Sequence, residues 1–169
     1  MYQFSAPFEL FQNLIGGHII VAPEIADALL KAKQSRVVCT INNEFAMQCA
    51  LISKGDGQYY VLFTKANAKK LGVREGDMLQ VQLAPDTSQY GIEMPEELAA
   101  LLEMDDDFDA LFHALTAGKQ RTLIHAVSSV KNTDGRLSRA LIISDYIKGG
   151  GTKIDQMTIN ELIRSHVRR

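Results

Sequence analysis

The 169-residue sequence is poor in cysteine and has no apolar run near the roughly 18 residues that a membrane-spanning helix requires. We therefore predict no membrane span. Two cysteines cannot form a disulfide framework in a chain of this length. Both Cys39 and Cys49 fall on the apolar side of predicted strands. We expect buried free thiols rather than a redox or metal pair, because apolar burial raises the pKa of a thiol.

Sequence motifs for catalysis and metal binding are also missing. The four histidines are spread singly along the chain, without the spacing of zinc ligands. There is neither a Gly-x-Ser-x-Gly elbow nor a phosphate-binding loop. The acidic residues 105–109 lack the spacing of a calcium loop, and the first turn of a helix explains them. We predict no catalytic residues, no metal and no cofactor, so an enzyme is the less favoured function.

An excess of one charge sign is absent as well. The formal net charge is −2, which argues against a dedicated nucleic-acid coat but not against a local basic patch. The N-terminus lacks a basic stretch followed by a long apolar core, so we predict no signal peptide and a cytoplasmic location. With 46% hydrophobic residues, the chain can bury the core of one or two small domains.

The most informative stretch is residues 65–83, KANAKKLGVREGDMLQVQL. It predicts a short helix at 65–71, stopped by Gly72, then a turn and a strand of alternating apolar residues. A similar unit lies about forty residues earlier, where GHIIV (17–21) aligns with GQYYV (57–61) and 36–41 aligns with 77–83. Short strands with turn signals therefore predict a small β-barrel built from two similar halves in one chain.

Composition changes near Pro85. Residues 93–109 contain eight acids and no base, whereas residues 119–153 contain seven bases and two acids. Helical periodicity begins here, with predicted N-caps at Asp105, Thr116, Thr133 and Thr158. Two predicted buried stripes are Phe108, Leu111, Phe112 and Leu115, and Leu137, Ala140, Leu141 and Ile147. We predict a β-barrel domain at 1–90 and a helical segment at 91–169, hence a mainly β fold with a C-terminal α-helical tail.

Several spaced features resemble two known families. Residues 41–43 (INN), Leu51, 55–60 (GDGQYY) and 65–77 resemble a bacterial domain of unknown function that adopts a double-split β-barrel. The distal part is similar to the helical segment called YdeI/OmpD-associated, or bacteriocin-protection, through MPEEL (94–98), Phe108, LT (115–116), Lys131, Asp134, Arg136 and Arg139. Together the resemblances cover roughly residues 2–148. They imply a fold but bring no established catalytic residues.

The run GVREGD at 72–77 also resembles the AbrB-like DNA-binding proteins, which have a similar helix, turn and strand. Those proteins build their barrel from two chains. Here both halves lie in one chain, so an AbrB-like barrel can close in a monomer, and monomer and homodimer both stay open. Fold alone does not settle function.

Two groups of bases are candidate sites. Lys65, Lys69, Lys70 and Arg74 form either a phosphate-contacting patch or a solvated helix face. A DNA site with about 6–10 phosphate contacts needs more bases than this run has. Further bases at Lys119, Arg121, Lys131, Arg136 and Arg139 either extend that site or are neutralised by the neighbouring acids. The helix pair that carries them is a helix-turn-helix or, more commonly, a plain αα-hairpin.

The leading expectation is a cytoplasmic binding protein associated with stress or bacteriocin protection. It would engage an unknown anionic ligand or protein partner where barrel and helices meet, through Lys65, Arg74, Lys131, Arg136 and Arg139. Two alternatives stay open. One is AbrB-like DNA binding through the barrel, and the other is an enzyme whose pocket lies under the helical tail.

Overall fold

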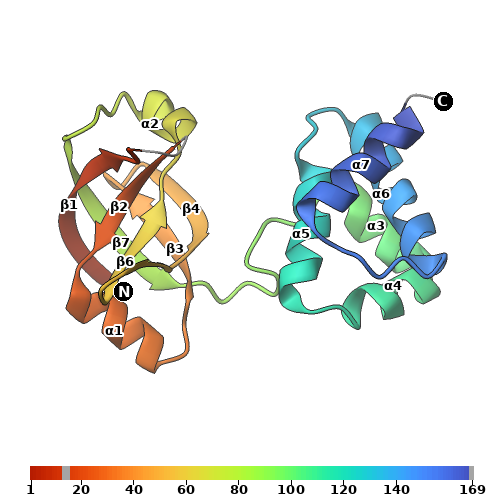
Figure 1. Ribbon diagram of the computed structural model, residues 1–169, viewed down its shortest axis with the longest axis horizontal. Coiled ribbons are helices and arrows are strands. Elements are labelled where there is room, and N and C mark those ends of the chain that lie inside the picture. The colour runs from red at the N-terminus through yellow and green to blue at the C-terminus, as the bar shows by residue number, and fades with distance from the viewer. Residues whose placement is uncertain (13–15, 168–169) are drawn as a thin grey trace. The chain divides into compact units, whose positions relative to one another are not determined.

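The computed structural model describes residues 1–12 and 16–167. The chain divides into two compact units, Met1–Thr87 and Ser88–Arg169, where the sequence predicted a boundary between residues 90 and 91. Each unit has its own hydrophobic core. The predicted order of a β-rich unit followed by a helical unit is confirmed (Figure 1).

The first unit is built on a sheet of antiparallel strands that curves into a barrel-like shape (Figure 1). The strands are β1 (Tyr2–Leu10), β2 (Gly17–Val21), β3 (Arg36–Ile41), β4 (Phe45–Ala50), β5 (Ile52–Gly55), β6 (Gln58–Leu62) and β7 (Met78–Pro85). Their order in the sheet is β4-β3-β7-β1-β2-β6-β5. Helices α1 (Pro23–Lys31) and α2 (Lys65–Leu71) lie at opposite ends of this unit (Figure 1).

The register of the sheet relates the two similar halves, β2–α1–β3 and β6–α2–β7. Strand β2 pairs with β6, and β3 pairs with β7, all antiparallel. Ile20 pairs with Tyr60, its counterpart in the aligned halves, and Thr40 pairs with Gln82. Residues on either side pair in reverse order, as Val21 does with Tyr59, which is the pattern that a two-fold axis through the central pairs produces. The AbrB-like double-split topology itself stays a prediction.

Local sequence signals set the turns of this unit. The Thr64 hydroxyl caps α2 by accepting a hydrogen bond from the Asn67 amide at 3.1 Å. Gly72 ends the helix in the left-handed region at φ 68°, which suits a residue without a β-carbon. Asn42 and Asn43 both have positive φ in the β3–β4 hairpin, as predicted.

Alternate residues of the strands fill the core, including Leu79, Val81 and Leu83 of β7, as the sequence pattern predicted. Cys39 and Cys49 are buried free thiols in this core. A hydrogen bond with Cys49, together with burial, raises the pKa of the Cys39 thiol. These cysteines therefore belong to the packed interior.

The second unit consists of helices around a central α6. They are α3 (Glu96–Met104), α4 (Asp106–His113), α5 (Ala117–Ser128), α6 (Thr133–Lys148) and α7 (Gln156–Val167). Helix α6 contacts the other four, and Leu98, Phe108, Phe112, Leu123 and Ile143 are fully buried among them. Asp105 and Thr116 cap α4 and α5, as predicted, by accepting hydrogen bonds from the amides of Phe108 and Lys119.

Two predicted caps are wrong by a short distance. Asn132 rather than Thr133 caps α6, because its side-chain oxygen accepts a hydrogen bond from the Gly135 amide. Helix α7 begins at Gln156, before the predicted cap at Thr158. The Asp155 carboxylate accepts hydrogen bonds from the amide and hydroxyl of Thr158 and so occupies the capping position.

Some predicted core positions are also wrong. Leu137 and Leu141 are 43% and 45% exposed, and Leu111 of α4 is 41% exposed. The buried stripe of α6 instead runs through Ala140, Ile143, Ser144 and Ile147. Leu137 and Leu141 therefore lie at the edge of the buried face of α6. The contacts of α6 with α3, α4, α5 and α7 determine which face is buried.

Candidate functional site

The first unit has an open groove between β1 and α2, with a volume of about 580 Å³. Its lining includes the basic side chains of Lys65, Lys69 and Arg74, and apolar side chains such as Phe8 and Val73. We call this the basic groove. It collects three of the four bases in the run that the sequence singled out.

Backbone geometry explains why these bases converge. Lys65 and Lys69 are four residues apart on α2 and therefore share one helix face. After Gly72 the chain turns back to β1, where the Gly76 amide donates to the Phe8 carbonyl at 2.8 Å. The Asp77 carboxylate accepts a hydrogen bond from the Arg74 amide at 2.8 Å, which fixes the turn that carries Arg74.

The basic groove keeps an excess of positive charge, since three cations and one carboxylate line it. Among the residues that the structure describes, Lys65, Lys69 and Arg74 make no ion pair, and all three are exposed. The Glu75 carboxylate also lines the groove, where it accepts a hydrogen bond from the Leu10 amide at 3.3 Å. Lys70 lies elsewhere, with its ammonium 5.1 Å from the centre of the Phe45 ring.

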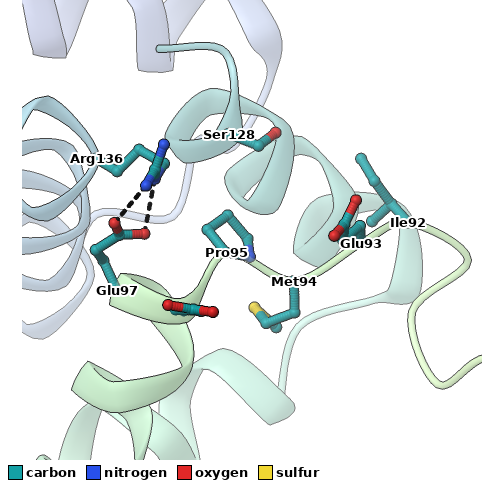
Figure 2. Close-up of a pocket in the computed structure, with 8 residues that line it drawn as sticks. Ile92, Glu93, Met94, Pro95, Glu97, Ser128 and Arg136 are labelled. Atoms are coloured by element: carbon teal, nitrogen blue, oxygen red, sulfur yellow. Dashed lines mark hydrogen bonds and ion pairs between the residues drawn. The ribbon is translucent and has the colours of Figure 1, made fainter. Parts of the chain in front are cut away.

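In the second unit, Arg136 is held by the carboxylate of Glu97. Its Nε and Nη2 donate to the two oxygens of Glu97 at 2.8 and 2.7 Å, and its Nη1 donates to the Lys131 carbonyl at 2.7 Å. Figure 2 shows this two-point ion pair at the edge of a pocket that also contains Glu93 and Met94. The hydrogen bonds from Arg136 hold the pKa of the Glu97 carboxyl below its usual range. The pair ties α6 to the start of α3.

The neighbouring bases are similarly engaged. Arg139 donates through Nη1 to the Ala126 carbonyl at 2.7 Å and to the Ser129 hydroxyl at 2.6 Å, at the end of α5. Lys148 forms an ion pair with Asp105. Arg136 and Lys148 therefore pair with acids of the same unit, whereas Arg139 is held by uncharged oxygens.

The five residues predicted to bind a ligand thus fall into two groups. Lys65 and Arg74 share the basic groove, whereas Lys131, Arg136 and Arg139 belong to the second unit. Arg136 and Arg139 make structural contacts there, and Lys131 is exposed. The binding role of these residues stays a prediction.

Sequence reasoning missed a hydrogen-bonded chain of Tyr90, His113 and Asp109. His113 Nε2 lies 2.9 Å from the Tyr90 hydroxyl, and His113 Nδ1 lies 3.0 Å from Asp109 Oδ1. All three line one pocket of about 550 Å³. Asp109 and His113 are four residues apart on a helix, which predicts that their side chains meet. No neighbouring residue in the sequence indicated Tyr90.

Two known families match this chain, one in each unit. Residues 4–83 match a family described as a domain of unknown function (DUF1905), and residues 91–150 match one described as bacteriocin-protection, YdeI or OmpD-associated (OmdA). Each match covers less than half of the chain, and we name the units Met1–Thr87 and Ser88–Arg169 the DUF1905 domain and the OmdA domain after these matches. The resemblance predicted from the sequence is therefore confirmed for each part. No curated protein and no solved structure matches this chain.

The basic groove lies within the residues that match DUF1905. The Tyr90 pocket lies in the OmdA domain, and two of its lining residues, Gln89 and Tyr90, come just before the matched residues 91–150. In residues 1–12 and 16–167, no group of three or more histidine, cysteine or acidic side chains is arranged to hold a metal ion. None of the helices in the described part of the chain has the length and apolar character needed to cross a membrane.

The DUF1905 domain also buries a histidine. His18 is 3% exposed and stacks on the Phe11 ring at 4.4 Å between centroids. Its Nε2 lies 3.3 Å from the Glu9 carboxylate and 3.4 Å from the Lys54 ammonium, and Tyr60 contacts the ring edge-on. Burial and the charge of Lys54 lower the pKa of His18, against the opposing effect of Glu9.

We expect the DUF1905 domain to lose stability as pH falls through about 6.5, the histidine pKa in an unfolded chain. Below that pH the unfolded chain binds a proton that the folded domain resists, so acid favours unfolding. His18 is the only histidine in residues 1–87, which makes the assignment specific. Urea unfolding of this domain, followed by NMR at pH 7.5 and 5.5, measures the loss. A His18→Gln variant with the same pH dependence as the natural chain would contradict this origin.

Proposed function

We propose that the protein binds an anionic ligand or partner in the basic groove of its DUF1905 domain. The carrying observation is that Lys65, Lys69 and Arg74 converge on one groove without an ion pair among the described residues. The bacteriocin-protection description of the OmdA family supports a protective role that rests on binding. We further propose that this binding takes place in the cytoplasm.

The groove favours a ligand that combines an anionic group with an apolar part. An exposed pair of opposite charges about 4 Å apart in water is worth roughly 1 kcal/mol, so three cations alone give weak binding. Apolar contact with Phe8, Leu10 and Val73 adds roughly 25 cal/mol for each Å² that leaves water. A groove of about 580 Å³ has room for a small organic molecule or a short peptide segment.

Two fluorescent probes of similar shape test this proposal. Anilinonaphthalenesulfonate carries an anionic sulfonate on an aromatic body, and phenylnaphthylamine is its uncharged counterpart. In the variant Lys65→Gln/Lys69→Gln/Arg74→Gln, the anionic probe is expected to bind roughly 100-fold more weakly, since each lost cation removes roughly 1 kcal/mol. Binding of the uncharged probe should change less than about twofold, because the apolar lining is intact.

The control variant is Lys31→Gln/Lys33→Gln, which removes charge at α1, at the other end of the unit (Figure 1). It should leave both probes unaffected. Equal weakening of the two probes, or equal effects of the two variants, would contradict a charge-selective groove. If a short DNA duplex displaces the anionic probe at physiological salt, with an affinity that falls steeply as salt rises, the AbrB-like alternative replaces this proposal.

A further inference from the structure

We propose that Tyr90, His113 and Asp109 form a reactive site in the OmdA domain, in which Tyr90 is a nucleophile for activated acyl groups. The site is independent of the basic groove, since the two lie in different domains. The arrangement has the three parts of an activated nucleophile: a hydroxyl, a base within hydrogen-bond reach, and a third group that orients the base.

The direction of each hydrogen bond follows from the atoms involved. His113 Nδ1 is 3.0 Å from both the carboxylate and the backbone carbonyl oxygen of Asp109, and neither oxygen can donate. Nδ1 must therefore carry the hydrogen. In the neutral ring Nε2 is then an acceptor, and the Tyr90 hydroxyl donates to it at 2.9 Å. Tyr90 thus points its proton at a base that is already in the correct tautomer.

A purely structural role for the Tyr90 hydroxyl is the main alternative. The Tyr90 ring already packs edge-on against Phe112, with 6.0 Å between centroids. Its backbone carbonyl also accepts a hydrogen bond from Arg121 at 3.5 Å. These contacts anchor the segment without the hydroxyl, and the hydroxyl bonds His113 beside the pocket that both residues line.

The pKa of Tyr90 indicates why a base is needed. Burial and the charge of Asp109 raise the pKa of the phenol, against a hydrogen bond from Gln89 that lowers it. Tyr90 is therefore a neutral phenol at physiological pH and a poor nucleophile by itself. Transfer of its proton to His113 during attack removes this barrier, and Asp109 stabilises the imidazolium that forms.

The reaction balances with water as the only co-reactant. Tyr90 Oη forms a bond to the acyl carbon as its proton moves to His113 Nε2. The bond from the acyl carbon to the leaving oxygen then breaks, and that oxygen takes the proton from His113. Water, deprotonated by His113, next attacks the acyl-tyrosine. The bond from the acyl carbon to Tyr90 Oη breaks, and Tyr90 Oη takes the proton back from His113. The products are a carboxylic acid and an alcohol, and both side chains return to their starting state.

The pocket also limits the substrate class. Glu103 and Asp106 line it beside Asp109, so it repels anions, while Met94 and Leu102 provide an apolar wall. An uncharged acyl compound with a good leaving group fits these walls. An anionic substrate is disfavoured here, which is the reverse of the selectivity expected for the basic groove.

The test uses the full chain and p-nitrophenyl acetate. We expect a burst of nitrophenol and a mass increase of one acetyl group on the peptide that contains Tyr90. In Tyr90→Phe, which keeps the packed ring, the rate of release should fall at least roughly tenfold and the labelled peptide should disappear. Tyr146→Phe, a change in the same domain, should behave like the natural chain. Labelling of lysines alone, or an unchanged rate in Tyr90→Phe, overturns the proposal.

Asp109 is a positioning residue, and the separation of kcat from KM distinguishes its role from a structural one. Without the carboxylate, the His113 ring loses a group that orients it, so kcat for p-nitrophenyl acetate should fall roughly 100-fold in Asp109→Asn while KM stays unchanged. The matched control is Asp106→Asn, which alters the same pocket and the same helix turn without touching His113. Equal melting temperatures show that both variants fold. If both variants have the same kcat and the same KM, Asp109 has no such role and the triad is refuted.

Discussion

Phe63→Ala is expected to lower the free energy of unfolding of the DUF1905 domain by about 3–5 kcal/mol. Phe63 is fully buried and meets Phe8 edge-on, with 5.3 Å between ring centroids, and Phe45 at 6.3 Å. Truncation removes this apolar contact and leaves a cavity that strands on both sides can close only in part. The total free energy of unfolding of a small domain is about 5–15 kcal/mol, so this loss is a large fraction of it.

The measurement is hydrogen exchange by mass spectrometry, read separately for peptides of the two domains. Exchange should rise in peptides before residue 87 and stay constant in peptides after it. Phe63→Leu is the control and should cost less than about 1.5 kcal/mol, because most of the volume is kept. Equal loss of protection in both domains would show that the chain unfolds as one cooperative unit. Since Phe8 also lines the basic groove, Phe63→Ala should weaken the binding of both fluorescent probes.

Features fixed by a few neighbouring residues were predictable from the sequence. Gly72 ends α2 in the left-handed region, and Asn42 and Asn43 turn the β3–β4 hairpin, because both depend on backbone conformations that few residues adopt. The offset of about forty residues between the two similar halves was also predictable, because the aligned strands pair with each other in the sheet. Ile20 pairs there with its counterpart Tyr60.

One local feature was ambiguous in the sequence, because Asn132 and Thr133 are both good caps and only the hydrogen bond to the Gly135 amide distinguishes them. Features decided by neighbours far along the chain were not predictable. Helix α6 has apolar residues on several sides, since it is covered by four other helices, so its periodicity does not show which side is buried. Leu137 and Leu141 were therefore assigned to the core although they lie at its edge.

The candidate sites divide in the same way. Lys65 and Lys69 were recognisable because a helix places them side by side, but the groove also needs β1, which is more than fifty residues away. Neutralisation of Arg136 by an acid was one of two alternatives from the sequence, but nothing local identified Glu97, 39 positions earlier, as the partner. Tyr90 and His113 were missed for the same reason, since only the tertiary fold brings them within 2.9 Å.

Phe112→Ala is expected to lower the free energy of unfolding of the OmdA domain by about 3–5 kcal/mol, and to disable the Tyr90 site with it. Phe112 is fully buried, packs edge-on against Phe108, and has its ring 6.0 Å from Tyr90 and 5.3 Å from His113. Removing this ring takes away the surface that fixes both ends of the reactive hydrogen bond. Hydrogen exchange in the OmdA domain should therefore rise, and acetylation of Tyr90 should fall.

The adjacent Leu111 offers a matched control, because it is 41% exposed on the same helix. Leu111→Ala should cost less than about 1 kcal/mol and leave the acetylation of Tyr90 intact, since little apolar surface leaves the core. Similar losses from both truncations would contradict the assignment of Phe112 to the core. Binding of the anionic probe to the basic groove should survive Phe112→Ala, because the DUF1905 domain has a separate core. If Tyr90 is no longer acetylated in Phe112→Ala while the basic groove still binds the anionic probe, each domain supports its own site.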